Sequence, residues 1–263
     1  MLSSVFLKTI FEKRWSIFWW FVSMFAMTLF VVLLFPTFKD TFGQTLSNVP
    51  DSLKQVLGTA HDYQRIEGYL HIQVFMQMIF LIVIYGIITF TGLLAGDEGN
   101  GTLQTLLSQP VSRGKIYAQK LFAGMTLLWV VNSAMFVAIW VGCLLIGESL
   151  NYWRVFEATN FVWLVTLIFS LIGYMVGAIT GKRGLAGILA GVYAFLAYLI
   201  SSLTNTVEWL KYPNYLSPIK YFSDFRILDE GLHVGNALLL IGVGVVMVVI
   251  GWLVFVRRDI YSR

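Results

Sequence analysis

Six long apolar runs constrain what this chain can fold into. Each has the roughly 20 residues that an α-helix needs to cross the hydrocarbon core of a bilayer. Only 12% of the 263 residues are charged, whereas a soluble domain carries about 25%, and the mean hydropathy is +0.77. The sequence therefore predicts an all-α integral membrane protein. The six predicted transmembrane helices cover residues 16–35, where Pro36 closes the span, 72–96, 121–147, 161–181, 185–204 and 236–256.

The basic residues are distributed unevenly between the two sides of these spans. With the N-terminus inside, the inner segments hold 11 Lys and Arg against four Asp and Glu, and the outer loops hold seven against ten. The shortest inner loop is Lys182-Arg183-Gly184, and short loops carry the most weight in the positive-inside rule. We therefore expect a multi-pass protein of the plasma or inner membrane with both termini in the cytoplasm. The net charge of +4 follows from this topology and indicates no nucleic acid partner.

The first 15 residues place Lys8, Lys13 and Arg14 among apolar residues at helical spacing. This pattern predicts an N-terminal amphipathic helix in the headgroup region before the first span.

Several kinds of chemistry are missing from the sequence. No Asp, Glu, Lys, Arg or His falls inside a predicted span, which argues against an ion-coupled transporter or an intramembrane hydrolase. The three histidines, His61, His71 and His233, lack metal-ligand spacing. No Gly-x-x-x-x-Gly-Lys-Ser/Thr phosphate loop is present. We therefore expect no catalytic residue, metal or cofactor in this chain, and any ATP hydrolysis must occur in another subunit.

The inner segment between the second and third spans differs from the rest of the chain. Asp97 and Glu98 stand where the span ends, and glycines at 96, 99 and 101 are expected to break the helix. A short capped helix should follow, with its leucines on one face. That helix either docks onto a partner or lies in the headgroup boundary. Its expected elements are Thr102 as N-cap, the leucines Leu103, Leu106 and Leu107, Pro110 as the stop, and Ser112 as the cap of the next helix.

The pattern Asp97-Glu98-x-x-Gly101-Thr102-Leu103-x-x-Leu106-Leu107-Ser108-x-Pro110-Val111-Ser112-Arg113 resembles the first cytoplasmic loop of ABC-2-type transporter permeases. The six-span layout agrees with that family over the whole chain. The Gly99-Asn100 pair departs from the family pattern and should loosen the entry to the helix.

The resemblance implies the transmembrane permease subunit of an ATP-driven exporter. A cytoplasmic coupling helix in this loop would fit into a cleft of a separate ABC ATPase. Two ATPase copies, which bind ATP and Mg, and a second permease copy, identical or related, would complete the transporter. The residues expected to serve ATPase coupling are Asp97, Glu98, Gly101, Thr102, Leu103, Leu106, Leu107, Pro110, Ser112 and Arg113.

The outer loops carry two further predictions. In the first loop, the spacing of Leu53, Val56 and Leu57 predicts a surface helix. The last loop, 205–235, is broken by Pro213 and Pro218 and reads either as a re-entrant pair of short helices or as a plain aromatic belt at the headgroup level. Its aromatic residues are Trp209, Tyr212, Tyr215, Tyr221, Phe222 and Phe225, and its segment 216–222 also resembles ABC-2 permeases.

Glycines recur at a spacing of four in the fourth and fifth spans, at Gly173, Gly177, Gly181, Gly187 and Gly191. Such faces let helix backbones approach closely in lipid, so we expect these two spans to pack together. Residues 1–263 then form one transmembrane permease domain. The alternatives are a membrane scaffold without transport activity and an ATP-independent channel, each recruiting a cytoplasmic partner through the same loop. The substrate is not encoded in a recognisable motif, although spans rich in Phe, Met and Leu suit an amphipathic or lipid-like molecule.

Overall fold

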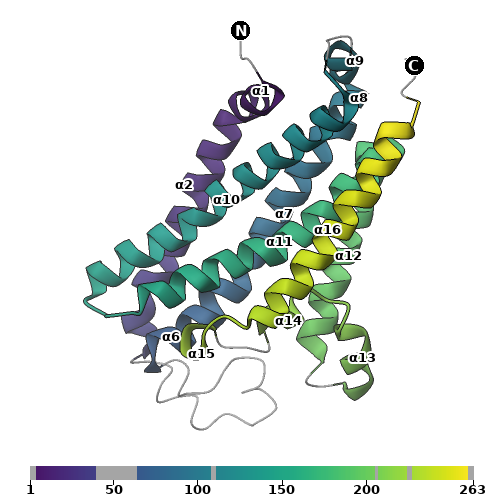
Figure 1. Cartoon of the computed structure of the whole chain (residues 1–263). Helices are drawn as coiled ribbons and strands as arrows, with labels where there is room; N and C mark the ends of the chain where they lie inside the picture. Colours follow the sequence, from purple (N-terminus) through teal and green to yellow (C-terminus); the bar gives the residue numbers. More distant parts are fainter. Residues whose placement is uncertain (1–3, 40–63, 108–110, 205–206, 224–226, 260–263) are drawn as a thin grey trace.

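The structure is a computed structural model that describes residues 4–39, 64–107, 111–204, 207–223 and 227–259, without the side chains of Gln104, Thr105 and Leu107. Long helices pack side by side in one bundle, and both chain termini lie at the same end (Figure 1), which we call the terminal end. No strand occurs in the described ranges. Six helices are long and apolar enough to cross a membrane, so the chain is an all-α integral membrane protein, as predicted.

The long helices are α2 (Arg14–Leu33), α7 (Met76–Thr91), α10 (Arg113–Ile146), α11 (Tyr152–Thr180), α12 (Arg183–Leu203) and α16 (Val234–Arg257). Short elements extend α7 in both directions, namely α6 (Ile66–Tyr69) and η2 (Leu70–Phe75) before it, and η3 (Gly92–Gly96) and α8 (Asp97–Gly99) after it. The remaining described helices are α1 (Val5–Glu12), α9 (Thr102–Leu107), η4 (Glu208–Leu210), α13 (Lys211–Asn214), α14 (Lys220–Ser223) and α15 (Ile227–Glu230). The predicted amphipathic helix corresponds to α1.

The helix boundaries differ from the prediction where polar residues join the helices. The third span begins at Arg113 and the fourth at Tyr152, because each helix extends beyond its apolar run. Pro36 does not end the first span, since residues 35–39 are again helical after a turn at Leu34. A proline in the first turn of a helix costs no hydrogen bond.

Helices α7 and α11 form the centre of the bundle. In each of the two spans that contain them, 72% of the most apolar window is buried. The corresponding share is 17% for the span that contains α2 and 22% for α12 and for α16. Helix α10 packs along α2, and α11 contacts α7, α12 and α16. The peripheral helices therefore leave most of their apolar surface to lipid or to partner subunits.

Hydrogen bonds between helices tie the centre together. The Tyr174 hydroxyl of α11 donates to the carbonyl of Tyr117 in α10 at 2.7 Å, and the Tyr117 hydroxyl donates to the carbonyl of Val248 in α16 at 3.0 Å. The buried Asn132 amide of α10 donates to the carbonyl of Thr159 in α11 at 2.9 Å. In lipid, such bonds add to van der Waals packing between helices.

Only the glycines of α11 lie in the contact between α11 and α12. A Cβ added to Gly173 would lie 3.5 Å from the Cβ of Ala190. A Cβ added to Gly177 would lie 3.8 Å from the Cβ of Ala186. No atom lies within 4 Å of a Cβ built on Gly187 or Gly191. The expectation that these two glycines pack against α11 is therefore wrong. The inward face of α12 is made instead by its buried alanines, Ala186, Ala190, Ala194 and Ala197.

At the opposite end of the bundle, the loop before α16 folds into the short helices η4, α13, α14 and α15. The buried Asn214 side chain accepts a hydrogen bond from the Ser201 hydroxyl of α12 at 2.8 Å. Phe222 is buried and stacks on His71 with ring centroids 5.6 Å apart, so its assignment to an exposed aromatic belt is wrong. The aromatic rings of Trp209, Tyr212 and Tyr215 are exposed, as a belt requires. The helix predicted around Leu53, Val56 and Leu57 lies outside the described residues, and so does Phe225.

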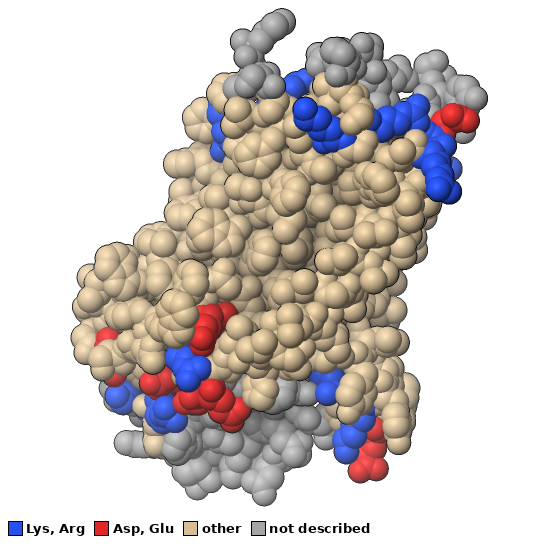
Figure 2. All heavy atoms as spheres, in the orientation of Figure 1, with Lys and Arg blue, Asp and Glu red and all other residues tan. Residues whose placement is uncertain are grey.

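The two ends of the molecule carry different charges. In the view of Figure 2, Lys and Arg gather at the terminal end, the opposite end mixes acidic and basic residues, and a band without charged residues separates them. The α1 helix, the 97–113 segment and the start of α12 all lie at the terminal end (Figure 1). The elements predicted to share the inner side of the membrane therefore share one end of the fold.

Candidate functional site

The 97–113 segment connects the second and third spans at the terminal end. After α8, the chain turns at Asn100 and Gly101, and α9 begins at Thr102. Gly101 has φ +72°, the left-handed region that favours glycine. It makes the break alone, because Gly96 and Gly99 lie in helical turns, contrary to the prediction that all three glycines interrupt the helix.

The two predicted cap residues behave differently. Thr102 is not an N-cap, because it is the first helical residue of α9 and its hydroxyl donates to the carbonyl of Asp97 at 3.1 Å. Ser112 does cap α10, since its side chain accepts the N–H of Lys115 at 3.4 Å. Pro110 lies outside the described residues, so its role as a helix stop stays a prediction.

The acidic pair is neutralised inside the chain. The Asp97 carboxylate forms an ion pair with the ammonium of Lys120 in α10, whose side chain is only 3% exposed. The Glu98 carboxylate pairs with the guanidinium of Arg258, the residue that follows α16. A buried ammonium without a counter-charge is costly, so the position of Asp97 is what allows Lys120 to be buried at the base of a span.

Glu98 also lies against the end of α11. Gly181 ends that helix with φ +67°, and a Cβ added there would lie 2.7 Å from a Glu98 carboxylate oxygen. A side chain at Gly181 would therefore meet both backbone strain and a carboxylate. On the far side of the segment, the Arg113 guanidinium donates to the carbonyl of Arg258. The segment is thus in contact with α10, α11 and the end of α16.

Leu103 and Leu106 of α9 are buried in the protein. Leu103 is fully buried and Leu106 is 6% exposed. The prediction that these two side chains fill a pocket on an ATPase is therefore wrong for this structure, and so is the alternative in which they lie in the headgroup boundary. Among the residues of the segment whose burial is described, the turn Gly99–Thr102 forms a continuous exposed stretch, and Ser112 is the other exposed position. The side chain of Leu107 lies outside the description.

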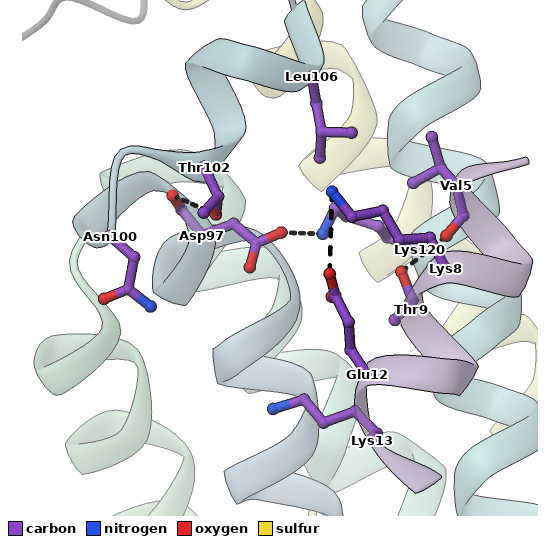
Figure 3. A pocket seen from close by; sticks show the side chains of 10 residues that line it. All are labelled: Val5, Lys8, Thr9, Glu12, Lys13, Asp97, Asn100, Thr102, Leu106 and Lys120. Atoms are coloured by element: carbon purple, nitrogen blue, oxygen red, sulfur yellow. Dashed lines mark hydrogen bonds and ion pairs between the residues drawn. The ribbon is translucent and has the colours of Figure 1, made fainter. Parts of the chain in front are cut away.

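A cavity of about 270 Å³ separates α1 from the 97–113 segment. Figure 3 shows Lys8 and Glu12 of α1, with Lys13 just after it, on one side, and Asp97, Thr102 and Leu106 on the other. Helix α1 is held in place by α10, because the backbone N–H of Val5 donates to the side-chain carbonyl of Gln119 at 3.0 Å. The full lining is Val5, Lys8, Thr9, Glu12, Lys13, Asp97, Asn100, Thr102, Leu106 and Lys120.

Sequence reasoning counted Lys120 and Arg258 only as topology signals and missed them as partners of Asp97 and Glu98. The sequence did contain a signal for these pairs. Asp97 and Glu98 are the only acids of the 97–113 loop, and Lys120 and Arg258 stand at the inner ends of predicted spans. Among the described residues, no cluster of three or more His, Cys, Asp or Glu is placed to hold a metal ion.

Comparison with known proteins identifies a family for this chain but no curated relative. No curated protein matches the chain at a significant level. A family model described as "ABC-2 family transporter protein" matches residues 10–260, which is nearly the whole sequence and includes all six spans and the 97–113 segment. The chain therefore belongs to the ABC-2 family of transporter membrane proteins.

Proposed function

We infer that this chain is the transmembrane permease subunit of an ATP-driven ABC-2 exporter, coupled to a separate ATPase through the 97–113 segment. Family membership supports the permease role, and the sequence has no phosphate loop of its own. Two ATPase subunits, which bind ATP and Mg, and a second permease copy complete the transporter. The excess of basic residues on the inner segments supports cytoplasmic termini. Export, rather than import, follows from the family resemblance.

The observation that carries this inference is how the 97–113 segment is fastened. Asp97 is paired to α10, Glu98 to the end of α16, and the carboxylate of Glu98 rests on the last turn of α11 at Gly181. Leu103 and Leu106 add buried apolar contacts, each worth about 1.5–3 kcal/mol. A force applied to this segment therefore reaches three membrane helices together.

The burial of the leucines changes which residues meet the ATPase. The α8–α9 turn, with Asn100 at its tip, offers the exposed surface, while the leucines hold the turn to the bundle. The ATPase contact is therefore assigned to Gly99–Thr102, and the acidic pair transmits force instead of forming the rim of the partner's pocket.

The test is to co-express the chain with the ABC ATPase encoded nearest to it and to purify the complex through a tag on the permease. Asn100→Trp places a bulky ring on the exposed turn, and we expect the ATPase recovered with it to fall at least tenfold. The matched control is Glu208→Trp, which adds the same ring at the opposite end, where the Glu208 side chain is 94% exposed.

Three results would contradict the proposal. Equal recovery of the ATPase with both variants would remove the turn from the interface. A complex that contains a cytoplasmic protein without ATP hydrolysis would favour the scaffold, and ion conductance by the purified chain alone would favour the channel.

A further inference from the structure

Two cations at the terminal end lie beside Gly92 and have no acidic partner within the described ranges. A Cβ on Gly92 would lie 3.9 Å from the Lys13 ammonium and 3.9 Å from the Arg183 guanidinium carbon. Neither Lys13 nor Arg183 forms an ion pair with any described carboxylate. The nearby acids are engaged elsewhere, since Glu12 pairs with Lys8 and Asp97 pairs with Lys120. Figure 3 shows the Lys13 side chain extending away from the Lys8–Glu12 pair.

These cations mark the boundary between polar and apolar surface. Lys13 directly precedes α2, and Arg183 is the first residue of α12. Both helices are long and apolar enough to span a membrane. Basic residues at this position lie at the level of lipid headgroups, where each Lys or Arg attracts anionic lipid. The point between them is therefore suited to a phosphate group.

An uncovered apolar stripe runs along α7 from this point into the bundle. Phe80, Ile84 and Ile88 are 39%, 39% and 49% exposed, although α7 belongs to one of the two most buried spans. Each is four residues after the one before, about 40° further around the helix, and the next position of that series is Gly92, a buried residue at the start of η3. The stripe therefore ends where the two cations meet.

The stripe lies between two helices that flank it. Tyr198 of α12 packs against Phe80 with ring centroids 5.3 Å apart, and Trp20 of α2 packs against Tyr85, next to the stripe, at 5.1 Å. The result is an exposed apolar strip of α7 between α2 and α12, with a cationic end at headgroup level.

We propose that Lys13 and Arg183 bind the phosphate of an anionic inner-leaflet phospholipid whose acyl chain lies along Phe80, Ile84 and Ile88. The ligand class follows from charge and shape together, because free phosphate explains the cations but leaves the stripe uncovered. The lipid site requires neither ATP nor an ATPase, so it stands or falls separately from the transport function.

The experiment is lipid titration of the detergent-purified protein, read by native mass spectrometry, with phosphatidylglycerol, phosphatidylcholine and inorganic phosphate as probes. We expect wild type to bind phosphatidylglycerol about tenfold more tightly than phosphatidylcholine, and millimolar phosphate not to displace it. Lys13→Gln with Arg183→Gln should weaken phosphatidylglycerol binding about thirtyfold, on the basis of two headgroup contacts. The control, Lys182→Gln with Arg257→Gln, removes the same charge from the same end and should change the affinity less than threefold.

A second variant tests the location without changing charge. The Cβ of Gly92→Ala would have no neighbour closer than 3.9 Å, so the variant should fold normally while placing a methyl group between the two cations, and we expect a several-fold loss of affinity. Any of three results would overturn the proposal. Wild type could bind the two lipids equally, the double variant and its control could lose phosphatidylglycerol affinity equally, or Gly92→Ala could leave that affinity unchanged. Displacement by inorganic phosphate would show a free-anion site and would refute the lipid assignment.

Discussion

The ion pair between Asp97 and Lys120 gives a quantitative test of how the 97–113 segment is held. Asp97→Asn leaves the Lys120 ammonium, 3% exposed, without its counter-charge. Breaking a buried pair from one side costs roughly 3–5 kcal/mol. The Asp97 side chain keeps 24% exposure, so water screens part of this cost and we expect the lower end, about 3 kcal/mol.

Thermal unfolding in detergent, followed by tryptophan fluorescence, measures this cost. For a chain of this size, about 3 kcal/mol corresponds to a fall in Tm of roughly 6–12 °C. Adding Lys120→Met to Asp97→Asn removes the stranded charge and keeps an apolar stem of similar length, so the double variant should recover most of the lost stability.

The neighbouring pair on α1 is the matched control. Lys8 and Glu12 are separated by 3.8 Å with side chains 46% and 54% exposed, and exposed pairs contribute about 0–1 kcal/mol. Glu12→Gln should therefore leave Tm nearly unchanged. Similar Tm values for Asp97→Asn and Glu12→Gln, or no recovery in the double variant, would refute the reasoning that a buried charge is neutralised there.

Three further predictions follow from individual positions. Gly181→Ala should cost about 1–3 kcal/mol, measured by thermal unfolding, because φ is +67° and Glu98 fills the space; Gly187→Ala has no neighbour within 4 Å and should match or exceed wild type, and a reversed order would contradict the packing described. Leu106→Asp places a carboxylate at a site that is 6% exposed, so limited proteolysis should cut the 97–113 segment faster than in wild type, and unchanged cleavage would place that side chain in solvent. Cysteines at Asn100 and at Tyr212, which is 82% exposed, should react with membrane-impermeant reagents from opposite sides; labelling from one side would overturn the topology.

The sequence was sufficient to predict the spans because apolar length alone decides which segments cross a bilayer. It also located the 97–113 segment, because the turn chemistry of Gly101 and Ser112 is local. Helix ends were less predictable: Arg113 and Tyr152 begin helices outside the apolar runs, and a hydropathy pattern cannot detect polar turns that continue a helix.

Contacts between distant segments were beyond the sequence pattern. The spacing of Leu103 and Leu106 fits a helix that docks onto a partner as well as one that packs inward. Only the fold shows that both side chains are buried. The same limit explains Gly187, whose spacing matches that of Gly177 but whose face points away from α11. The partnership of Glu98 with Arg258 joins residues on either side of four spans, a separation that no local periodicity encodes.

The most direct test of the central claim is photo-crosslinking from the exposed α8–α9 turn. A photoreactive amino acid at Asn100, in membranes that contain the ATPase, should form an adduct with the mass of permease plus ATPase. The same group at Glu208, 94% exposed at the opposite end, should form none. An ATPase adduct from Asn100 alone is the result that the account predicts; no ATPase adduct from Asn100, or equal yields from both positions, would contradict it.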